Sequence, residues 1–578
     1  MSKTVSDQLV DALAAAGVER IYGIVGDSLN PVMEALREHE QLRWVGVRHE
    51  ETAAFAASAE AQLSGRVAAC CGSCGPGNMH LINGLYDAHR SCAPVFALAS
   101  HIPTAAIGSD YFQETHPTNF FRECTRYCEL ASQAAQAPQV TLSALRAAVA
   151  GPGVGMAVLP GDVAAAPAAD EKWQPAPPSP PDTLPEPGEA ELRRMAGLIN
   201  AAKRVTFFCG AGCAGAREEL LELAKKVRAP IGYTLRAKDI MEADNPLGIG
   251  MSGLLGWGDA TRALHEAELV VLWGTDFPYT SFLPEHGNVV QVDTRAEALG
   301  RRTRLCLAIC ADAAHTARRL LPLVHEDRGD EFLDRCLSRH GNEVTRLQCN
   351  VRYVDEGAPI RPEYLTRLVS DRAEPDAVFT VDTGTPVIWC ARYVQGMPRR
   401  RILGSFKHGS MACALAMAIG AKAAAPARQV IALCGDGGLS MLPGDMLTLV
   451  QEGLAAKLLV YNNSSLDFVA LEQEIIGMAH SGTALHPTNY ADIARSMGLK
   501  AWRVQHAAEL PSAVLSWLAA QGPALLDVVV DTHELALPPD TGMLQALGLT
   551  QALGARPVHH ELDTLKRLLF GKARILDA

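Results

Sequence analysis

The sequence has no surplus of positive charge: 52 Lys and Arg residues stand against 64 Asp and Glu residues, giving a formal net charge of -12. A nucleic-acid partner is therefore disfavoured, because binding a phosphate backbone needs a basic surface. No apolar run reaches the roughly 18–20 residues of a membrane-spanning helix, and residues 1–7 lack the apolar stretch of a signal peptide. We therefore expect a cytoplasmic chain without a membrane span.

The cysteines show no disulfide framework, although there are 15 of them, because they are scattered from Cys70 to Cys434 without regular spacing. Cys71 and Cys74 form a CxxC pair inside a glycine-rich run, but no second CxxC or His pair completes a zinc site. We expect buried, reduced thiols rather than metal ligands.

The length of 578 residues is too great for one hydrophobic core, since domains typically contain about 100–200 residues. The stretch Ala164–Pro187 is dense in Ala, Pro and acidic residues, which is typical of an interdomain linker. A second break lies near Glu326–Pro362, and a tail follows Asp531. These breaks predict domains at residues 1–165, 190–335 and 336–533, a linker at 166–189 and a C-terminal tail at 534–578.

Each block alternates short apolar runs with amphipathic segments of helical length, such as Val5–Ala16. The apolar runs are soon followed by Gly or Asp, which is typical of buried parallel strands. The predicted fold class is α/β, with three doubly wound parallel-sheet domains that bind ligands beyond the carboxyl ends of their strands. The strand candidates include Val205–Phe208, Leu269–Leu272, Val289–Val292, Val378–Val381, Val430–Leu433, Leu458–Tyr461 and Leu525–Val530.

One strand candidate runs directly into a glycine-rich turn that carries a carboxylate. Asp436 lies in the run Gly-Asp-Gly-Gly after Val430–Leu433, and we expect a helix to start near Leu439. Glycines there allow backbone N–H groups to approach a phosphate. Asn463 follows the next strand, 27 residues after Asp436, so both side chains should lie side by side and offer oxygen ligands to Mg²⁺. The alternative is that the glycine run is only a tight strand-to-helix turn.

This pairing resembles the signature of thiamine-diphosphate enzymes. The resemblance implies that Asp436 and Asn463 bind Mg²⁺ together with the carbonyl of Ser465, and that Gly437 and Gly438 contact the diphosphate. In this family the activating glutamate and the diphosphate site come from different subunits, so the resemblance also implies a homo-oligomer, with a dimer as the minimum and a tetramer expected.

The activating glutamate and the pyrimidine clamp follow from the same resemblance. Glu50, which opens an Ala-rich helix, matches the acid that hydrogen-bonds to the pyrimidine ring, whereas Glu51 should point elsewhere. Met411 matches the apolar side chain that enforces the bent cofactor, with Gly409 and Ser410 in the same clamp. On the residues alone, both acids could merely favour a helix N-terminus, and Met411 could be a core residue.

The middle block carries a Gly-rich run, Gly210-Ala-Gly-Cys-Ala-Gly215, after the strand Val205–Phe208. The acidic residue expected about 20 positions later in an NAD site is missing, which argues against NAD. The chain instead resembles quinone-dependent pyruvate dehydrogenases and pyruvate oxidases, from Gly26-Asp-Ser-Leu-Asn30 to Glu534-Leu-Ala-Leu-Pro538. The FAD contacts implied by this resemblance are Ser252, Gly253, Leu254, Leu255, Thr275, Asp276, Phe277, Pro278, Tyr279 and Asp293.

The implied reaction is the oxidative decarboxylation of pyruvate to acetate and CO₂, with electrons passing through FAD to ubiquinone. Thr383 and Asp467 stand where close relatives usually carry valine and glycine, so the preferred 2-oxo acid stays open. The implied substrate-pocket residues are Phe112, Gln113, Thr383, Phe468 and Glu472.

The C-terminal tail has two possible roles. Leu562, Leu565, Leu568 and Leu569 share one helical face beside basic residues, which favours a peripheral anchor at the cytoplasmic face of the inner membrane. A helix packed on a protein domain is the alternative.

The rival reactions are phosphate-dependent pyruvate oxidation to acetyl phosphate and acetolactate synthesis with FAD in no redox role. A non-oxidative decarboxylase is disfavoured because paired histidines are absent around His116. A non-catalytic paralogue is disfavoured because Glu50, Asp436 and Asn463 are all present.

Overall fold

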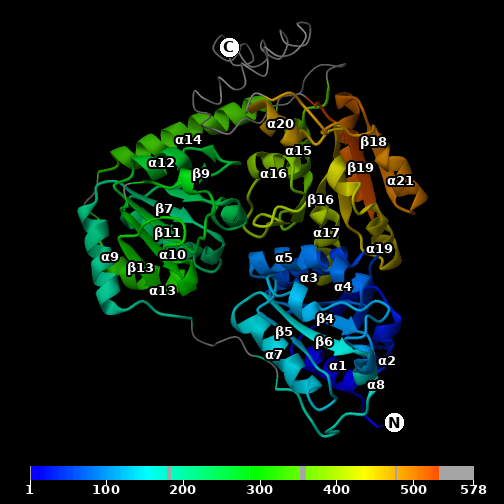
Figure 1. Cartoon of the computed structure of the whole chain (residues 1–578). Helices are drawn as coiled ribbons and strands as arrows, with labels where there is room; N and C mark the ends of the chain where they lie inside the picture. Colours follow the sequence, from blue (N-terminus) through cyan, green and yellow to red (C-terminus); the bar gives the residue numbers. More distant parts are fainter. Residues whose placement is uncertain are drawn as a thin grey trace.

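A computed structural model of the chain describes residues 2–176, 178, 184–285, 287–326, 329–351, 359–475 and 478–532. They form three α/β domains with parallel sheets, which confirms the predicted fold class (Figure 1). We call these the N-terminal, middle and C-terminal domains. The predicted tail at 534–578 and part of the predicted linker at 166–189 lie outside the described residues.

The N-terminal domain contains a six-stranded parallel sheet in the order β2-β1-β3-β4-β6-β5. Successive residues of a strand point to opposite faces, and here both faces are covered: Ala97 of β4 joins one hydrophobic core and Leu98 joins the other. All seven residues of β4 are therefore buried. The strands are β1 Arg20–Gly23, β2 Arg43–Gly46, β3 Ala68–Gly72, β4 Val95–His101, β5 Tyr127–Leu130 and β6 Val154–Pro160; the helices are α1 Val5–Ala15, α2 Asn30–Glu38, α3 Glu50–Ser64, α4 Pro76–His80, α5 Ile82–Ser91, α6 Pro117–Phe120, α7 Ala137–Ala150 and α8 Gly161–Ala165.

The middle domain has a seven-stranded sheet in the order β10-β9-β8-β7-β11-β12-β13, in which only the β10–β9 pair is antiparallel. The predicted boundary at residue 335 falls inside α14, whose Phe332 and Cys336 pack against Ile249 and Ala260 of this domain. The strands are β7 Val205–Cys209, β8 Ile231–Tyr233, β9 Gly248–Met251, β10 Trp257–Gly258, β11 Leu269–Trp273, β12 Val289–Asp293 and β13 Leu307–Cys310; the helices are α9 Glu189–Ala201, α10 Arg217–Lys226, α11 Lys238–Met241, α12 Ala260–Glu266, α13 Ala313–Leu320 and α14 Glu331–Asn350.

The C-terminal domain repeats the topology of the N-terminal domain, with the parallel strand order β15-β14-β16-β17-β19-β18. The strands are β14 Val378–Val381, β15 Arg401–Gly404, β16 Val430–Gly435, β17 Lys457–Asn462, β18 Lys500–Val504 and β19 Ala524–Val529; the helices are α15 Pro362–Arg372, α16 Thr385–Tyr393, α17 Cys413–Ala424, α18 Asp436–Leu439, α19 Met446–Gln451, α20 Asp467–Ile475, α21 Tyr490–Ser496 and α22 Leu510–Ala519. Among the described residues, no helix combines the length and apolar character that crossing a membrane requires.

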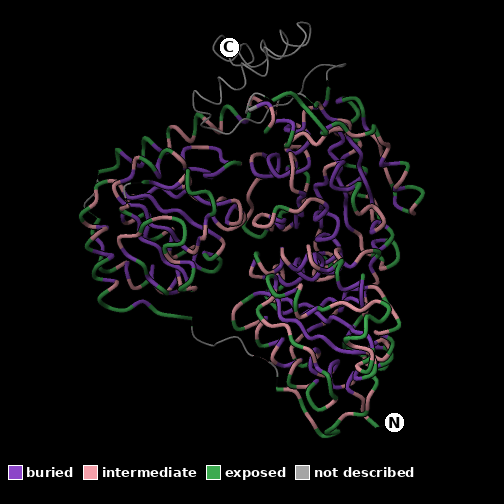
Figure 2. Tube along the Cα trace, in the orientation of Figure 1, coloured by how far each residue is buried: buried purple, intermediate pink, exposed green. Residues whose placement is uncertain are grey.

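The N-terminal and C-terminal domains share a core in which α3 packs on α17, and the contact is buried along its length (Figure 2). Small residues make this contact close. A Cβ atom added to Gly420 of α17 would lie 2.0 Å from the carbonyl oxygen of Ala56 on α3. The Ala-rich composition of α3 therefore lets the two helices meet backbone to backbone, and this contact fixes the distance between the two domains.

Replacing Gly420 with Ala should destabilise the chain by about 1–3 kcal/mol, the usual cost of overpacking a core. Chemical denaturation monitored by fluorescence would measure this loss. Gly197, which lies in α9 with no atom within 4 Å of an added Cβ, provides the control. Gly197→Ala should be neutral or stabilising, because alanine favours a helix interior. Equal effects of the two substitutions would contradict close packing at Gly420.

Candidate active site

The predicted metal ligands lie together at the carboxyl edge of the C-terminal sheet, where β16 and β17 are neighbouring parallel strands. Asp436 is 4% exposed, and its Oδ2 accepts the backbone N–H groups of Asn463 at 3.1 Å and Ser464 at 2.6 Å. The side-chain oxygen of Asn463 accepts the N–H of Ser465 at 3.1 Å. Burial raises the pKa of Asp436 to about 6, and the N–H groups oppose that rise. The oxygen donors of this cluster fit a hard divalent cation.

The helix that follows β16 begins at a different residue from the one predicted. It begins at Asp436 and ends at Leu439, instead of starting near Leu439. The two glycines pack tightly: a Cβ on Gly437 would lie 2.7 Å from Leu466 Cδ2, and one on Gly438 would lie 2.3 Å from an oxygen of Asp382. These glycines are therefore required by close packing inside the protein, in addition to any contact with a phosphate.

Sequence reasoning missed Asp382, whose carboxylate packs against the glycine-rich turn at residues 435–438. It follows β14 directly and is 1% exposed. Its carboxylate accepts the N–H of Ala414 at 2.8 Å and that of Gly435 at 3.3 Å, while burial raises the pKa of Asp382 to about 7. We call residues 435–438 the diphosphate turn, because the predicted diphosphate contacts lie there. Asp382 thus joins the diphosphate turn to the start of α17. The available signal was a carboxylate at the end of a buried strand.

The segment 405–411, which we call the clamp loop, carries the predicted pyrimidine clamp. Gly409 has a positive φ of 82°, and its N–H donates to the carbonyl of Ser405 at 2.7 Å. The N–H of Ser410 donates to Ser405 Oγ at 3.0 Å. The methyl group of Met411 lies 3.3 Å from the position of a Cβ on Gly437. The structure therefore brings the predicted clamp residues against the diphosphate turn.

Glu50 is the first residue of α3 and is 5% exposed. Its Oε2 lies 2.9 Å from Nδ1 of His80, whose ring stacks on His49 with 4.4 Å between centroids. Glu51 has a different partner, as expected, since its carboxylate accepts the side-chain N–H of Asn83 at 2.7 Å. The buried Glu50 carboxylate is thus held in place by the imidazole of His80 beside it.

The predicted substrate-pocket residues differ widely in burial. Phe112 is 77% exposed, and Glu472 is exposed as well. Gln113 has a positive φ of 61° and accepts from the thiol of Cys74 at 3.1 Å, whereas Phe468 packs partly against the core. Thr383 is half-buried after β14. Within the described part of the chain, nothing covers the Phe112 side chain.

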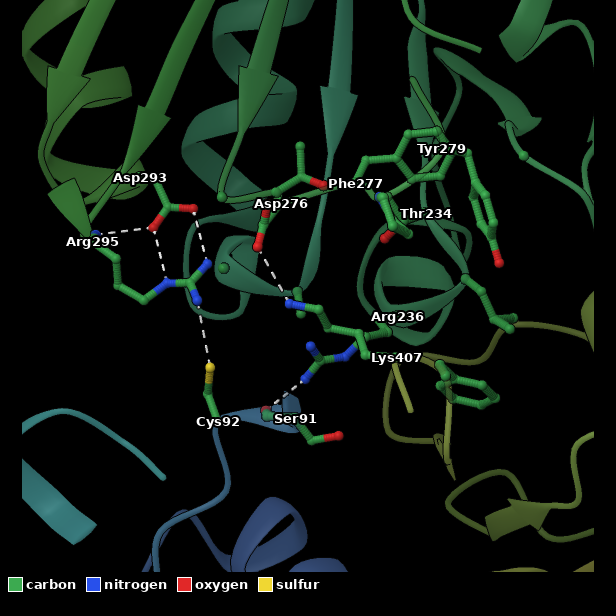
Figure 3. A pocket seen from close by; sticks show the side chains of 18 of the residues that line it. Ser91, Cys92, Thr234, Arg236, Asp276, Phe277, Tyr279, Asp293, Arg295 and Lys407 are labelled. Carbon is green, nitrogen blue, oxygen red and sulfur yellow. Dashed lines mark hydrogen bonds and ion pairs between the residues drawn. The ribbon is translucent and has the colours of Figure 1, made fainter. Parts of the chain in front are cut away.

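A cavity of about 460 Å³ lies where the three domains meet (Figure 3). Its position beyond β7 and β11 is the carboxyl edge of the middle sheet, the expected location for a ligand in such a fold. Gly212 and Gly274 line the cavity and pack closely on each other: a Cβ on Gly212 would lie 2.9 Å from the carbonyl oxygen of Gly274. All ten residues predicted to contact FAD line the cavity: Ser252, Gly253, Leu254, Leu255, Thr275, Asp276, Phe277, Pro278, Tyr279 and Asp293.

Charged side chains from separate segments also converge on this cavity, and sequence reasoning missed the three cations among them. Arg236 donates to the carbonyl of Ser91 at 2.9 Å, Arg295 lies 3.2 Å from Asp293, and Lys407 lies 3.4 Å from Asp276. Burial lowers the pKa of Arg236 and of Lys407. Three cations against two carboxylates, with glycine turns beside them, suit a dinucleotide that carries a diphosphate. Asp293, one of the predicted FAD contacts, is ion-paired with Arg295.

Comparison with known proteins agrees with this geometry. Three family models of thiamine pyrophosphate enzymes match the chain: the N-terminal TPP binding domain at residues 3–120, the central domain at 192–320 and the C-terminal TPP binding domain at 382–528. The fold and the site thus define an enzyme of the thiamine-diphosphate class, and the chain belongs to the thiamine pyrophosphate enzyme family.

Full-length relatives narrow the class without selecting one reaction. The chain is 33% identical to the putative thiamine pyrophosphate-containing protein YdaP of Bacillus subtilis over 553 residues, which cover 95% of each chain. It is 32% identical to the pyruvate oxidase of Lactiplantibacillus plantarum, covering 92% of this chain and 89% of that protein. It is 30% identical to the large subunit of acetolactate synthase isozyme 1 of Escherichia coli, covering 93% of this chain and 95% of that protein.

Proposed function

We propose that this enzyme catalyses the oxidative decarboxylation of pyruvate and transfers the electrons to ubiquinone, using thiamine diphosphate, Mg²⁺ and FAD. In the balanced reaction, pyruvate and water give acetate and CO₂, and one quinone takes up two electrons and two protons to become the quinol. The observation that carries the proposal is the clamp loop. Its Phe406 and Lys407 line the interdomain cavity, and its Met411 contacts the diphosphate turn. One short segment therefore connects the two sites between which electrons would pass.

The residues of this chain would have distinct roles in cofactor binding, proton sharing and substrate orientation. When bound, thiamine diphosphate supplies the nucleophilic carbon and FAD accepts two electrons. Asp436, Asn463 and the Ser465 carbonyl would hold Mg²⁺, and Glu50 would share a proton with the pyrimidine ring. The pocket residues Phe112, Gln113, Thr383, Phe468 and Glu472 would orient the 2-oxo acid and limit access of water.

We also propose that the active form is a homo-oligomer, at least a dimer, with the cofactor between subunits. Support comes from large apolar side chains that are exposed in one chain: Val25, Met79 and Phe112 on the N-terminal domain, and Met441 and Leu447 on the C-terminal domain. A second copy would cover them. Peripheral contact with the cytoplasmic face of the inner membrane, through residues 534–578, is part of the same proposal and is supported by the leucine and lysine pattern of that segment.

An anaerobic assay with pyruvate tests the reaction. We expect the flavin to bleach, acetate and CO₂ to form in equal amounts without added phosphate, and a soluble quinone to restore the oxidised flavin. Dependence on phosphate with release of peroxide under air would select the oxidase instead. A flavin that stays oxidised while acetolactate accumulates would contradict the proposal and favour the synthase.

A further inference from the structure

The clamp loop belongs to the C-terminal domain and contacts both the middle and the N-terminal domain. Lys407 Nζ lies 3.4 Å from Asp276 of the middle domain, a contact visible in Figure 3. On the other side, Asn83 of α5 binds two loop residues: its Nδ2 donates to Ser410 Oγ at 2.8 Å, and its Oδ1 lies 2.8 Å from Nε2 of His408. The loop is therefore held between the cavity and the N-terminal domain.

The loop is also internally braced, so a displacement at one end should reach the other. The bonds from Gly409 and Ser410 back to Ser405 close it into a compact turn. Only three residues separate Lys407, at the cavity, from Met411, at the thiamine clamp. Packed and hydrogen-bonded segments of this kind transmit changes of position because they adopt discrete arrangements.

The ion pair of Lys407 is anchored firmly on the cavity side. Asp276 is 3% exposed in its side chain and is also bound by Arg301 at 3.0 Å and Arg302 at 3.3 Å. A ligand that fills the cavity must set the position of Asp276 and Lys407, because both line it. Loss of Lys407 would still leave Asp276 paired, so the substitution does not strand a buried carboxylate.

We propose that Lys407 is a positioning residue that couples the flavin cavity to the thiamine clamp, so that FAD and thiamine diphosphate each bind more tightly when the other is present. This inference rests on the proposed use of FAD. By ordinary linkage, the coupling factor is the same in both directions. The chemistry of the coupling is electrostatic and steric: the dinucleotide fixes the Lys407–Asp276 pair, and the braced loop then holds Met411 against the diphosphate turn.

Calorimetric titration of the full-length chain with thiamine diphosphate at saturating Mg²⁺ tests the coupling. In the wild-type chain, FAD should tighten thiamine diphosphate binding by about tenfold relative to flavin-free protein. Lys407→Met should reduce this ratio to below about twofold, and Lys407→Arg should retain most of it. Lys422→Met is the matched control, since Lys422 is a half-buried lysine of α17 whose Nζ donates to the Arg428 carbonyl at 2.7 Å, away from the cavity.

The outcomes separate this inference from the proposed function. A wild-type ratio near one, with FAD bound, would overturn the coupling while leaving the reaction intact. If FAD tightened thiamine diphosphate binding as much in Lys407→Met as in the wild-type chain, Lys407 would have no role in the coupling. If Lys407→Met folds poorly, Asp276→Asn tests the same ion pair and should lose the coupling in the same way. Failure of the wild-type chain to bind FAD at all would instead remove the proposed function.

Discussion

Replacing Glu50 with Gln is expected to lower turnover by about a thousandfold, within the range found when a general acid–base group is lost. The amide keeps the shape of the side chain but cannot share a proton with the pyrimidine ring. Glu50 is buried at the start of α3, with His80 as its hydrogen-bonding partner. Because an amide fits that position, the variant should fold and bind thiamine diphosphate normally. Steady-state CO₂ release, together with calorimetric cofactor binding, would measure both effects.

The adjacent acid supplies the matched control. Glu51→Gln makes the same change of charge in the same helical turn, but its carboxylate contacts Asn83. An amide oxygen can still accept that hydrogen bond, so this variant should keep most of the activity. If Glu50→Gln retained more than a tenth of the wild-type rate, or if both variants lost activity equally, Glu50 would not be the activating acid.

The fold could be predicted because buried parallel strands are continuous apolar runs. The predicted strands Val430–Leu433 and Leu458–Tyr461 fall within β16 and β17, and the helix predicted at Val5–Ala16 matches α1 to one residue. The pairing of Asp436 with Asn463 followed from topology alone, since adjacent parallel strands end at one edge of the sheet. The predicted start near Leu439 was three residues too late, because the glycines that suggested an open turn are helical and pack against Asp382 and Leu466.

The cavity could not be completed from sequence because its charges come from distant segments. Arg236, Arg295 and Lys407 lie in three separate segments of the chain, and Ser91 and Cys92 come from the N-terminal domain. No periodicity or spacing joins such residues, since their proximity depends on how three domains pack.

Replacing Asp436 with Asn is expected to raise the Mg²⁺ concentration needed for thiamine diphosphate binding by about 100-fold or more, since even changes to residues behind a metal ligand commonly cost 10–100-fold. A carboxylate gives a hard dication both charge and oxygen, whereas an amide gives only a neutral oxygen. The fold should survive, because the amide oxygen can still accept an N–H from Asn463 or Ser464, which now bind Oδ2.

Asp445→Asn serves as the control for loss of a buried carboxylate in the same domain. Asp445 is 1% exposed and is already bound by the N–H of Arg48 and the hydroxyls of Thr52 and Thr448. This substitution should lower the midpoint of thermal unfolding without changing the half-saturating Mg²⁺ concentration. Chelation should release the cofactor from the wild-type chain, and added Mg²⁺ should restore binding. If Asp436→Asn titrated with Mg²⁺ like the wild-type chain, the ion would be held elsewhere, and the assignment of Asp436 as its ligand would fail.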